Sequence, residues 1–540
     1  MTAHRERRTA MDVDLHAPRA GVSPGAAPRA VSGAGARKWW AVALFTAVYL
    51  PLTLQRAWVK PLWEDELFTL ALSRPPLGEI WKALSTGADQ HPFPFYALTH
   101  LMLATSLPVE AALRLPQVVA GWVAAMAVFL YLARVLDSHY GLLGMFCLMS
   151  TAAWGYATEA RGYELMVAGI ALAFLAWQAV GRRWGAAAGL ALALMAAASS
   201  HYFALLAVIP LAIAEASRTR SRGEVRGRVW MAFLAAAVPV LLSFPLIQAS
   251  RSYAGTFWGK PSFQGVSDSY LLLLGSSVFC LAPLVALGSW ATVADEPGSR
   301  RRIGKVPTEE FVALAGLLAL PVISVGVTML VVGAFAARYM LPATLGLAML
   351  AAIALHGLYR GRATLALASS FVLAASLLYV ASMTISLDKQ ERERQQGLTA
   401  WIQEGRDPRL PVLVAQPKEF LSLARYAPAT LAGRLMFLGD TAQANYYMRQ
   451  DTAERGFAAL KRWFPPTIVT YDELRARDRR FLLLTDWGDF GIRNWALSKL
   501  LDDRARIQLL GRNRDVQLFM VELPSDSSAG RRPWPPNPAM

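Results

Sequence analysis

Two adjacent carboxylates, Asp65 and Glu66, follow the first long apolar segment of the chain. A carboxylate at the edge of a membrane, where water is partly excluded, can act as a general base that takes the proton of a hydroxyl nucleophile. With Glu64, the same residues would also suit the first turn of a surface helix, where the helix dipole favours acidic side chains. The spacing alone leaves both interpretations open.

His91 and Tyr96 lie later in the same polar stretch. One interpretation is that they form a wall of a substrate pocket. The other is that Pro92 and Pro94 begin an interfacial helix, with His91 and Tyr96 among the aromatic residues that gather at the membrane surface.

A further acid–base group, Glu159, Arg161 and Tyr163, lies between two later apolar segments. A carboxylate and a guanidinium beside a cavity at membrane level can bind a phosphate and orient a base. The alternative is a simple turn whose Arg161 reaches out to lipid headgroups.

His201, Arg338 and Tyr339 also stand at the ends of apolar segments. A single histidine in such a turn is more often an interfacial residue than a ligand. Arg338 could clamp a lipid phosphate, because arginine binds phosphate through two parallel hydrogen bonds, or it could serve as an interface anchor.

Composition indicates what must position these residues. The chain has 540 residues, of which 55% are hydrophobic and 17% are charged, whereas a soluble protein has about 25% charged residues. Charged residues are scarce in residues 39–386, where apolar segments predict about eleven transmembrane helices. The predicted spans are residues 39–56, 113–132, 142–157, 163–180, 184–199, 202–216, 230–249, 270–293, 311–332, 339–358 and 363–386.

Basic clusters predict the orientation of these spans. They occur at Arg182 and Arg183, at 218–228, at 300–305, and at Arg360 and Arg362. The positive-inside rule places such clusters in the cytoplasm, together with residues 1–38, a basic and disordered tail. The net charge of +16 therefore reflects membrane topology, and nucleic-acid binding is not favoured. The candidate residues all fall on the opposite, extracytoplasmic side.

Two further regions complete the predicted organisation. Residues 59–112 form the first extracytoplasmic loop, which contains a short interfacial helix at 95–107. Residues 387–524 form an extracytoplasmic α/β domain, with buried strands at 411–415, 435–438 and 481–484, helices at 419–426 and 495–502, and a closing hairpin of 507–510 and 516–521. We predict that residues 525–540 form a disordered tail.

Several kinds of chemistry have no motif in the chain. Cys147 and Cys280 both lie in apolar segments and predict neither a disulfide framework nor a metal cluster. The sequence also lacks a P-loop, a G-x-G-x-x-G, an H-E-x-x-H and a C-x-x-C. Because nucleotide sugars are cytoplasmic, an outward site that transfers sugar would use a lipid-linked donor.

The candidate residues occur in an order that resembles a known family. The ordered set is Asp65-Glu66, His91-Pro92 with Tyr96, Ala112-Leu113-Arg114-Leu115-Pro116, Glu159-Ala160-Arg161-Gly162-Tyr163, His201-Tyr202-Phe203, and Arg338-Tyr339 with Leu341-Pro342. It resembles the bacterial membrane glycosyltransferases of the C-type (GT-C) fold, which are similar to protein O-mannosyltransferases and the aminoarabinose transferase of lipid A. The resemblance covers residues 39–386. One departure is that Phe93 separates Pro92 from Pro94, where the family often has two adjacent prolines.

The resemblance implies a polyprenyl-phosphate sugar donor, an outward active site in the bacterial inner membrane, and inversion at the sugar carbon. It implies that Asp65 is the catalytic base with Glu66 beside it. Glu159 and Arg161 would lie near the reaction centre, and Arg338 would hold the donor phosphate. The acceptor would be a cell-envelope glycan, a lipid or a protein. Metal dependence varies among the relatives, so a divalent metal remains a possible cofactor, although these residues predict no metal site.

Two other functional classes remain as alternatives. A transporter or flippase for lipid-linked sugars would explain many spans, but it predicts mid-span charges, of which the chain has few, and a pseudo-repeat, which it lacks. A polysaccharide ligase or polymerase gives no reason for an acidic pair immediately after the first span. A structural role leaves the one-sided group of Asp, Glu, His and Arg unexplained. We therefore predict the glycosyltransferase.

Overall fold

The computed structural model describes residues 32–181, 183, 185–251, 255, 259–275, 277–293, 306–331, 333–462, 467–486 and 495–524. Most of the predicted N-terminal tail, Arg182, the basic cluster at 300–305 and the predicted tail at 525–540 lie outside these residues. The side chain of Cys280 is also outside the description.

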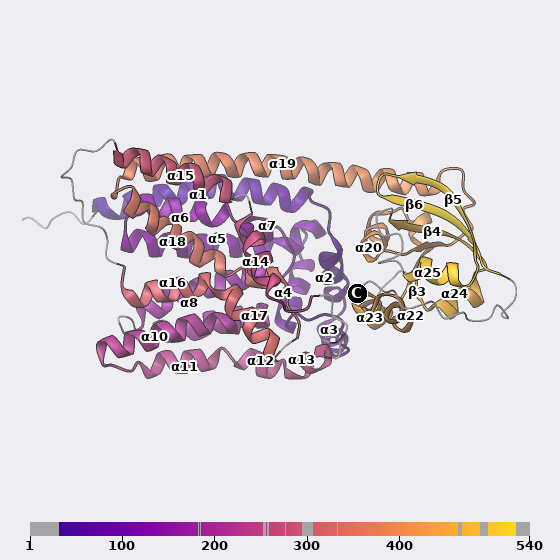
Figure 1. The fold of residues 1–540 in the computed structure, drawn as a ribbon, viewed down its shortest axis with the longest axis horizontal. Coiled ribbons are helices and arrows are strands. Elements are labelled where there is room, and N and C mark those ends of the chain that lie inside the picture. Colours follow the sequence, from indigo (N-terminus) through magenta and orange to yellow (C-terminus); the bar gives the residue numbers. More distant parts are fainter. Residues whose placement is uncertain are drawn as a thin grey trace, which may run out of the picture. The chain divides into compact units, whose positions relative to one another are not determined.

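The described chain is helical as far as residue 403 (Figure 1). The α-helices are α1 (Ser32–Val59), α2 (Glu64–Ser73), α3 (Leu77–Ser85), α4 (Phe93–Leu103), α5 (Val109–Val135), α6 (Ser138–Met149), α7 (Ala152–Tyr156), α8 (Tyr163–Ala179), α9 (Ala186–Ser200), α10 (Val208–Arg222), α11 (Gly227–Ala235), α12 (Val238–Leu242), α13 (Phe244–Arg251), α14 (Gln264–Leu274), α15 (Ser277–Val293), α16 (Thr308–Leu318), α17 (Leu320–Val331), α18 (Ala343–Leu358) and α19 (Ala363–Gln403). Two short 3₁₀ helices are η1 (Tyr202–Ala207) and η2 (Ala337–Met340).

Several of these helices have the length and composition of membrane spans. Within the described residues, four qualify alone: Trp39–Val59, Val109–Val135, Tyr202–Arg222 and Ala363–Gln403. Two bent pairs, Gly227–Leu242 with Phe244–Arg251 and Thr308–Leu318 with Leu320–Val331, qualify together, and five apolar helices are shorter. A helical fold with several apolar helices is thus confirmed, whereas the number of about eleven spans stays a prediction.

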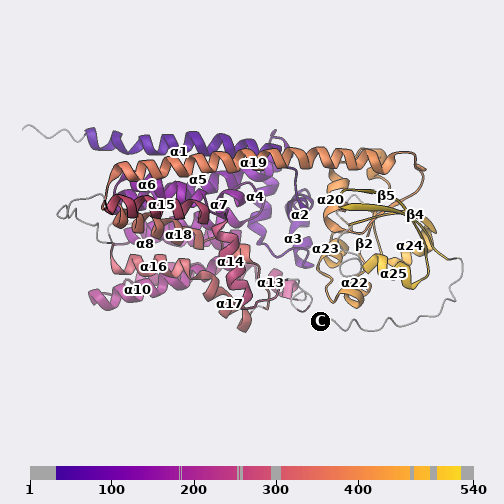
Figure 2. The same cartoon turned by 45° about the horizontal axis from the view of Figure 1, so that its top comes forward.

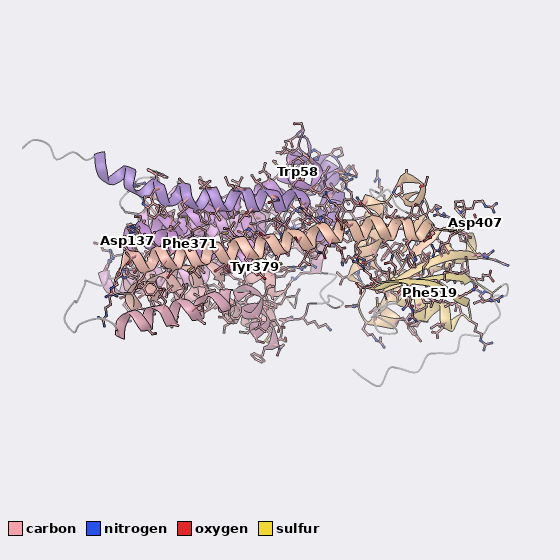
Figure 3. All side chains as sticks on the ribbon, turned by 90° about the horizontal axis from the view of Figure 1, so that it is seen from above. Trp58, Asp137, Phe371, Tyr379, Asp407 and Phe519 are labelled. Carbon is pink, nitrogen blue, oxygen red and sulfur yellow. The ribbon has the colours of Figure 1, made fainter. Side chains whose placement is uncertain are left out.

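Helices α1 and α19 carry large side chains on their outer faces (Figure 3). Phe371 and Tyr379 on α19 are 76% and 64% exposed, and Trp58 on α1 is 53% exposed. Leu373 and Leu377 of α19, four residues apart, are buried instead. Large aromatic side chains that are exposed on the outer faces of apolar helices are more favourable in lipid than in water. These faces of α1 and α19 are therefore suited to contact with lipid.

Small residues let the helices of the bundle approach closely. A Cβ atom on Gly144 of α6 would lie 2.1 Å from the side chain of Leu132 on α5. A Cβ atom on Gly169 of α8 would lie 2.8 Å from that of Ala197 on α9. Such contacts are typical of helices that associate in membranes, where close packing replaces hydrophobic burial as the driving force.

The C-terminal residues form an α/β domain after α19 (Figure 2). The sheet has the order β3-β2-β1-β4-β6-β5; the pairs among β3, β2, β1 and β4 are parallel, and those of β6 with β4 and β5 are antiparallel. The strands are β1 (Val412–Val414), β2 (Leu435–Leu438), β3 (Thr467–Val469), β4 (Arg480–Asp486), β5 (Arg506–Asn513) and β6 (Val516–Glu522). The helices are α20 (Pro417–Tyr426), α21 (Ala429–Ala432), α22 (Thr441–Met448), α23 (Thr452–Leu460), α24 (Tyr471–Arg477) and α25 (Trp495–Asp502).

This domain confirms the predicted α/β character and the predicted strands, helices and hairpin. The alternation of strand side chains explains its two hydrophobic layers, because Val412 and Val414 belong to one cluster and Leu413 to the other. Strand β3, Thr467–Val469, was not predicted, since only two of its residues, Ile468 and Val469, are apolar and buried.

The α/β domain shares one of its hydrophobic layers with α2. Leu67 and Leu70 of α2 belong to the same buried cluster as Leu421 and Phe457 of the domain. The phenol of Tyr426 accepts a hydrogen bond from the backbone N–H of Leu62 at 2.8 Å. The start of α2, which carries the candidate acidic pair, is therefore held against the C-terminal domain.

Candidate functional site

Helix α2 begins immediately after an extended residue, Trp63, and carries three acidic residues in its first turn. The Glu66 carboxylate accepts a hydrogen bond from the backbone N–H of Trp63 at 3.2 Å, which caps the helix. The acidic first turn that the sequence suggested is therefore present. Its neighbouring carboxylates, Asp65 and Glu66, point into different surroundings.

Glu66 is fully buried and anchors the fold. Its carboxylate accepts hydrogen bonds from Arg114 Nε at 2.7 Å and Arg114 Nη2 at 2.6 Å, and from the backbone N–H of Ala160 at 2.8 Å. Burial alone would raise the pKa of the Glu66 carboxyl, but the charges of Arg114 and Lys60 and these hydrogen bonds lower it to about 2. Glu66 thus joins α2, α5 and the turn before α8 as a permanent anion.

Asp65, by contrast, is partly open, with 23% of its side chain exposed. Its Oδ2 atom lies 3.1 Å from Nη2 of Arg338 and 3.9 Å from Nε of Arg161. Arg338 comes from η2, so residues about 270 positions apart in the chain meet here. The carboxylate therefore sits between two guanidinium groups, beside open space.

Arg161 is buried at the centre of a polar network. Its guanidinium donates to the Asp89 carboxylate, with Nη1 2.8 Å from Oδ2 and Nη2 3.3 Å from Oδ1, and to the Thr69 hydroxyl at 3.1 Å. Nη2 also lies 2.9 Å from Nδ1 of His91. Nδ1 also lies 3.3 Å from Oδ1 of Asp89, but because a guanidinium can only donate, the shorter contact with Arg161 makes Nδ1 an acceptor and leaves the proton of a neutral His91 on Nε2. Burial and the charge of Arg161 lower the pKa of His91, which favours this neutral form.

His201 belongs to a cluster of aromatic rings next to this network. Its ring centroid lies 5.0 Å from that of His91, 5.4 Å from that of Tyr163 and 4.7 Å from that of Tyr339. Burial, followed by the charges of the neighbouring cations, lowers the pKa of His201 well below its ordinary value. His201 is therefore a neutral wall of the site.

Two turns approach each other closely enough to require glycine. A Cβ atom on Gly162 would lie 2.2 Å from the backbone oxygen of Ser200. The residues next to these two are Arg161 and His201. The absence of a side chain at 162 thus lets Arg161 and His201 face the same space.

These groups surround a cavity of about 450 Å³. Six predicted residues line it: Asp65, His91, Arg161, His201, Arg338 and Tyr339. Apolar side chains complete the wall, namely Phe68, Phe203, Leu205, Leu206, Ile247 and Val327. Thr452, Ala453 and Gly456 of the C-terminal domain also line it. The cavity thus combines acidic, basic and apolar walls.

The other four predicted residues lie outside the cavity lining. Glu66 is buried with Arg114, and Glu159 pairs with Lys60 at 3.6 Å. Tyr163 is buried among the rings around His201, and Tyr96 is buried on α4. None of the four is among the residues that line the cavity.

Some lining residues were missed in the sequence. Asp89 lies two positions before His91 in the same loop, so its position beside a candidate histidine could have identified it as a site residue. Glu64 adjoins the acidic pair and lines the cavity as well. Arg251 at the end of α13 and Thr452 on α23 carried no local signal, because only folding brings them near Asp65.

No group of three or more His, Cys, Asp or Glu side chains among the described residues has the geometry to hold a metal ion. A divalent metal cofactor therefore remains only a prediction of the family resemblance.

Comparisons with known proteins bear on the fold. No family model matches the chain, and no curated protein matches it. Among solved structures, the chain is similar to ArnT from Cupriavidus metallidurans bound to undecaprenyl phosphate, with 13% identity, a TM-score of 0.56, and coverage of 89% of this chain and 98% of that chain. It is similar to ArnT in the apo state, with 14% identity, a TM-score of 0.56, and coverage of 90% and 98%. The chain therefore has the fold of ArnT, which confirms the expected resemblance to the aminoarabinose transferase and its GT-C membrane fold.

Proposed function

We propose that this protein is a membrane glycosyltransferase that takes a sugar from a polyprenyl-phosphate donor and transfers it, with inversion, to an extracytoplasmic acceptor. The observation that supports this proposal most strongly is that Asp65 lies between Arg338 and Arg161 in a cavity that also has apolar walls. The proposal places the N-terminus in the cytoplasm, and the cavity and the α/β domain outside the bacterial inner membrane.

The cavity suits an amphiphilic donor. Leu205, Leu206 and Ile247 supply apolar surface for an isoprenoid chain, and Arg338 supplies a cation for its phosphate. The ArnT structure with a similar fold was solved with undecaprenyl phosphate bound, which supports a donor of this chemical class.

The proposed reaction is a direct displacement at the sugar carbon. The Asp65 carboxylate takes the proton of the acceptor hydroxyl while the oxygen forms its bond to the sugar carbon. The bond from that carbon to the phosphate oxygen breaks, and polyprenyl phosphate leaves with both electrons. Arg338 stabilises the negative charge that grows on the phosphate. A donor phosphate bound to Arg338 would also compete for the guanidinium that now pairs with Asp65, which would free the base.

The test is Asp65→Asn in purified protein, assayed with radiolabelled polyprenyl-phosphate sugars and membranes as the source of acceptor. We expect transfer to fall by at least about 10²-fold, the lower end of a general-base contribution, while the thermal unfolding temperature stays unchanged. Asp268→Asn, on an exposed part of α14, is the matched control and should keep full activity. Full transfer by Asp65→Asn would contradict the proposal.

A further inference from the structure

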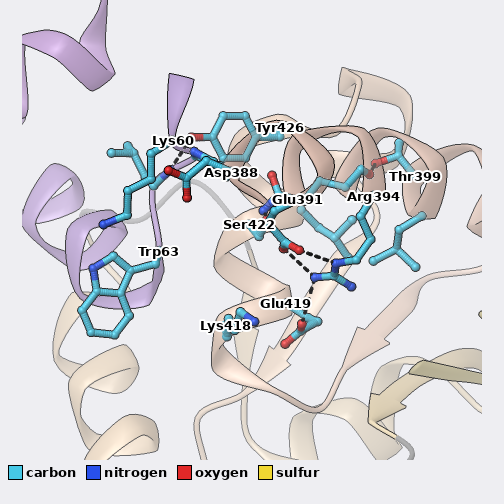
Figure 4. Close-up of a pocket in the computed structure, with 15 residues that line it drawn as sticks. Lys60, Trp63, Asp388, Glu391, Arg394, Thr399, Lys418, Glu419, Ser422 and Tyr426 are labelled. Carbon is cyan, nitrogen blue, oxygen red and sulfur yellow. Dashed lines mark hydrogen bonds and ion pairs between the residues drawn. The ribbon is translucent and has the colours of Figure 1, made fainter. Parts of the chain in front are cut away.

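A second, smaller pocket lies on the other side of the start of α2. Its volume is about 220 Å³, and it is formed by the segment after α1, the outer part of α19 and helix α20 (Figure 4). This volume is small beside the roughly 300–1,000 Å³ of pockets for drug-sized ligands, so it fits one compact unit.

The charges that line this pocket cancel. Three are cationic, on Lys60, Arg394 and Lys418, and three are anionic, on Asp388, Glu391 and Glu419. A pocket for a phosphate or a carboxylate would carry an excess of positive charge. The balance therefore favours an uncharged ligand.

The polar groups of the pocket are held in place by one another. Arg394 donates to both oxygens of Glu391 at 2.7 and 2.8 Å and lies 3.7 Å from the carboxylate of Glu419 (Figure 4). Gln395 and Thr399 add amide and hydroxyl groups. Donors and acceptors are thus interleaved and pre-organised, as a ligand with many hydroxyl groups requires.

Two aromatic residues lie beside these polar groups. Trp63 and Tyr426 both line the pocket. The indole N–H of Trp63 is buried and has no hydrogen-bond partner among the described residues. Since an indole N–H can only donate, this atom needs an acceptor such as a hydroxyl oxygen.

The position of the pocket relates it to the first cavity. Trp63 lines the small pocket, and the next two residues, Glu64 and Asp65, line the cavity. The guanidinium of Arg338, which pairs with Asp65, lies 5.8 Å from the ring centroid of Trp63. One short segment thus separates the two spaces, and a molecule in the small pocket lies next to the Asp65 segment.

We propose that this small pocket, the acceptor pocket, binds an uncharged saccharide unit of the acceptor, so that the acceptor is a glycan or a glycolipid. This rests on the proposed function, because the saccharide is the partner of the donor in that same transfer. Arg394, Glu391 and Glu419 would bind its hydroxyl groups, and Trp63 would contact its ring.

Protection of introduced cysteines from maleimide tests the acceptor pocket without an activity assay. Cys147 and Cys280 are first replaced by alanine in the full-length protein in nanodiscs. Ser422→Cys then reports on the acceptor pocket, and Ser250→Cys on the first cavity. Gln395→Cys, on α19, is a second reporter in the acceptor pocket if Ser422→Cys does not fold.

The probes are the methyl glycosides of glucose, galactose, mannose and N-acetylglucosamine, together with undecaprenyl phosphate and inorganic phosphate. We expect at least one glycoside to slow labelling of Ser422→Cys by about tenfold at ten times its Kd, and to leave Ser250→Cys unaffected. Undecaprenyl phosphate should do the reverse.

The outcomes separate the two proposals. If no glycoside protects Ser422→Cys, or if inorganic phosphate protects it instead, the saccharide pocket is refuted even when undecaprenyl phosphate protects Ser250→Cys. If undecaprenyl phosphate fails to protect Ser250→Cys, the lipid-linked donor is contradicted, whatever happens at Ser422→Cys.

Discussion

Neighbouring carboxylates with opposite roles should respond differently to the same substitution. We predict that Glu66→Gln unfolds more easily, whereas Asp65→Asn keeps wild-type stability. The reason is the burial of the Glu66–Arg114 ion pair, in which both side chains are fully shielded from water. Removing one partner leaves the Arg114 charge buried without compensation, which costs about 3–5 kcal/mol.

The pKa of Glu66 gives a second route to this magnitude. Its carboxyl has a pKa of about 2 in the folded protein and 4.5 as an ordinary value. A difference of this size corresponds to about 3 kcal/mol of stability. Because the pKa is lowered, this stabilisation is fully present above pH 4.5 and is lost as the pH falls toward 2.

The assay is reversible unfolding by sodium dodecyl sulfate in mixed micelles, followed by far-ultraviolet circular dichroism at about pH 7 and at about pH 4. We expect Glu66→Gln to keep most of its deficit at about pH 4, with a decrease of about 1 kcal/mol, because the folded carboxyl, with a pKa of about 2, is still ionised there and only the unfolded chain has begun to take up a proton. Equal stability of Glu66→Gln and wild type at both pH values, combined with loss of transfer, would refute the anchoring role and restore Glu66 as a catalytic residue.

Two more predictions concern residues beside the cavity. Gly162→Ala should lower stability by about 1–3 kcal/mol through its clash with the backbone oxygen of Ser200, whereas Gly155→Ala, whose Cβ meets nothing within 4 Å, should be neutral in the same unfolding assay. Burial, and then the charge of Asp65, raise the pKa of Glu64 from 4.5 to about 7. The folded protein therefore keeps a proton that the unfolded chain has released, so ionisation of Glu64 lowers stability as the pH rises from 4.5 through 7. Glu64→Gln should unfold at a higher temperature than wild type at about pH 8 and at a similar one at about pH 4, and no difference at pH 8 would contradict this.

Local patterns in the sequence were sufficient for much of the architecture. Long apolar segments predict helices by their length, and buried strands such as Leu435–Leu438 stand out as apolar runs bounded by turn residues. They were insufficient for the short strand Thr467–Val469. They also missed the bend between Thr308–Leu318 and Leu320–Val331, because apolar length alone takes no account of Pro321, which interrupts the helix there.

The residues of the candidate site were likewise predictable only in part. Residue type and position at the ends of apolar segments identified Asp65, Arg161 and Arg338, since charged groups there need a polar partner. The same reasoning treated Asp65 and Glu66 alike. Only the fold separates them, because one turn of α2 directs Glu66 toward Arg114 and Asp65 toward Arg338.

The sequence by itself therefore determined a helical membrane protein with a C-terminal α/β domain and a set of candidate polar residues. Tertiary structure decided which of them meet and which further residues join them. Asp89 pairs with Arg161 across 72 positions, and the domain at Thr452 lines the same cavity as Asp65. Such pairings depend on helix packing between distant segments, and no local propensity or spacing encodes them.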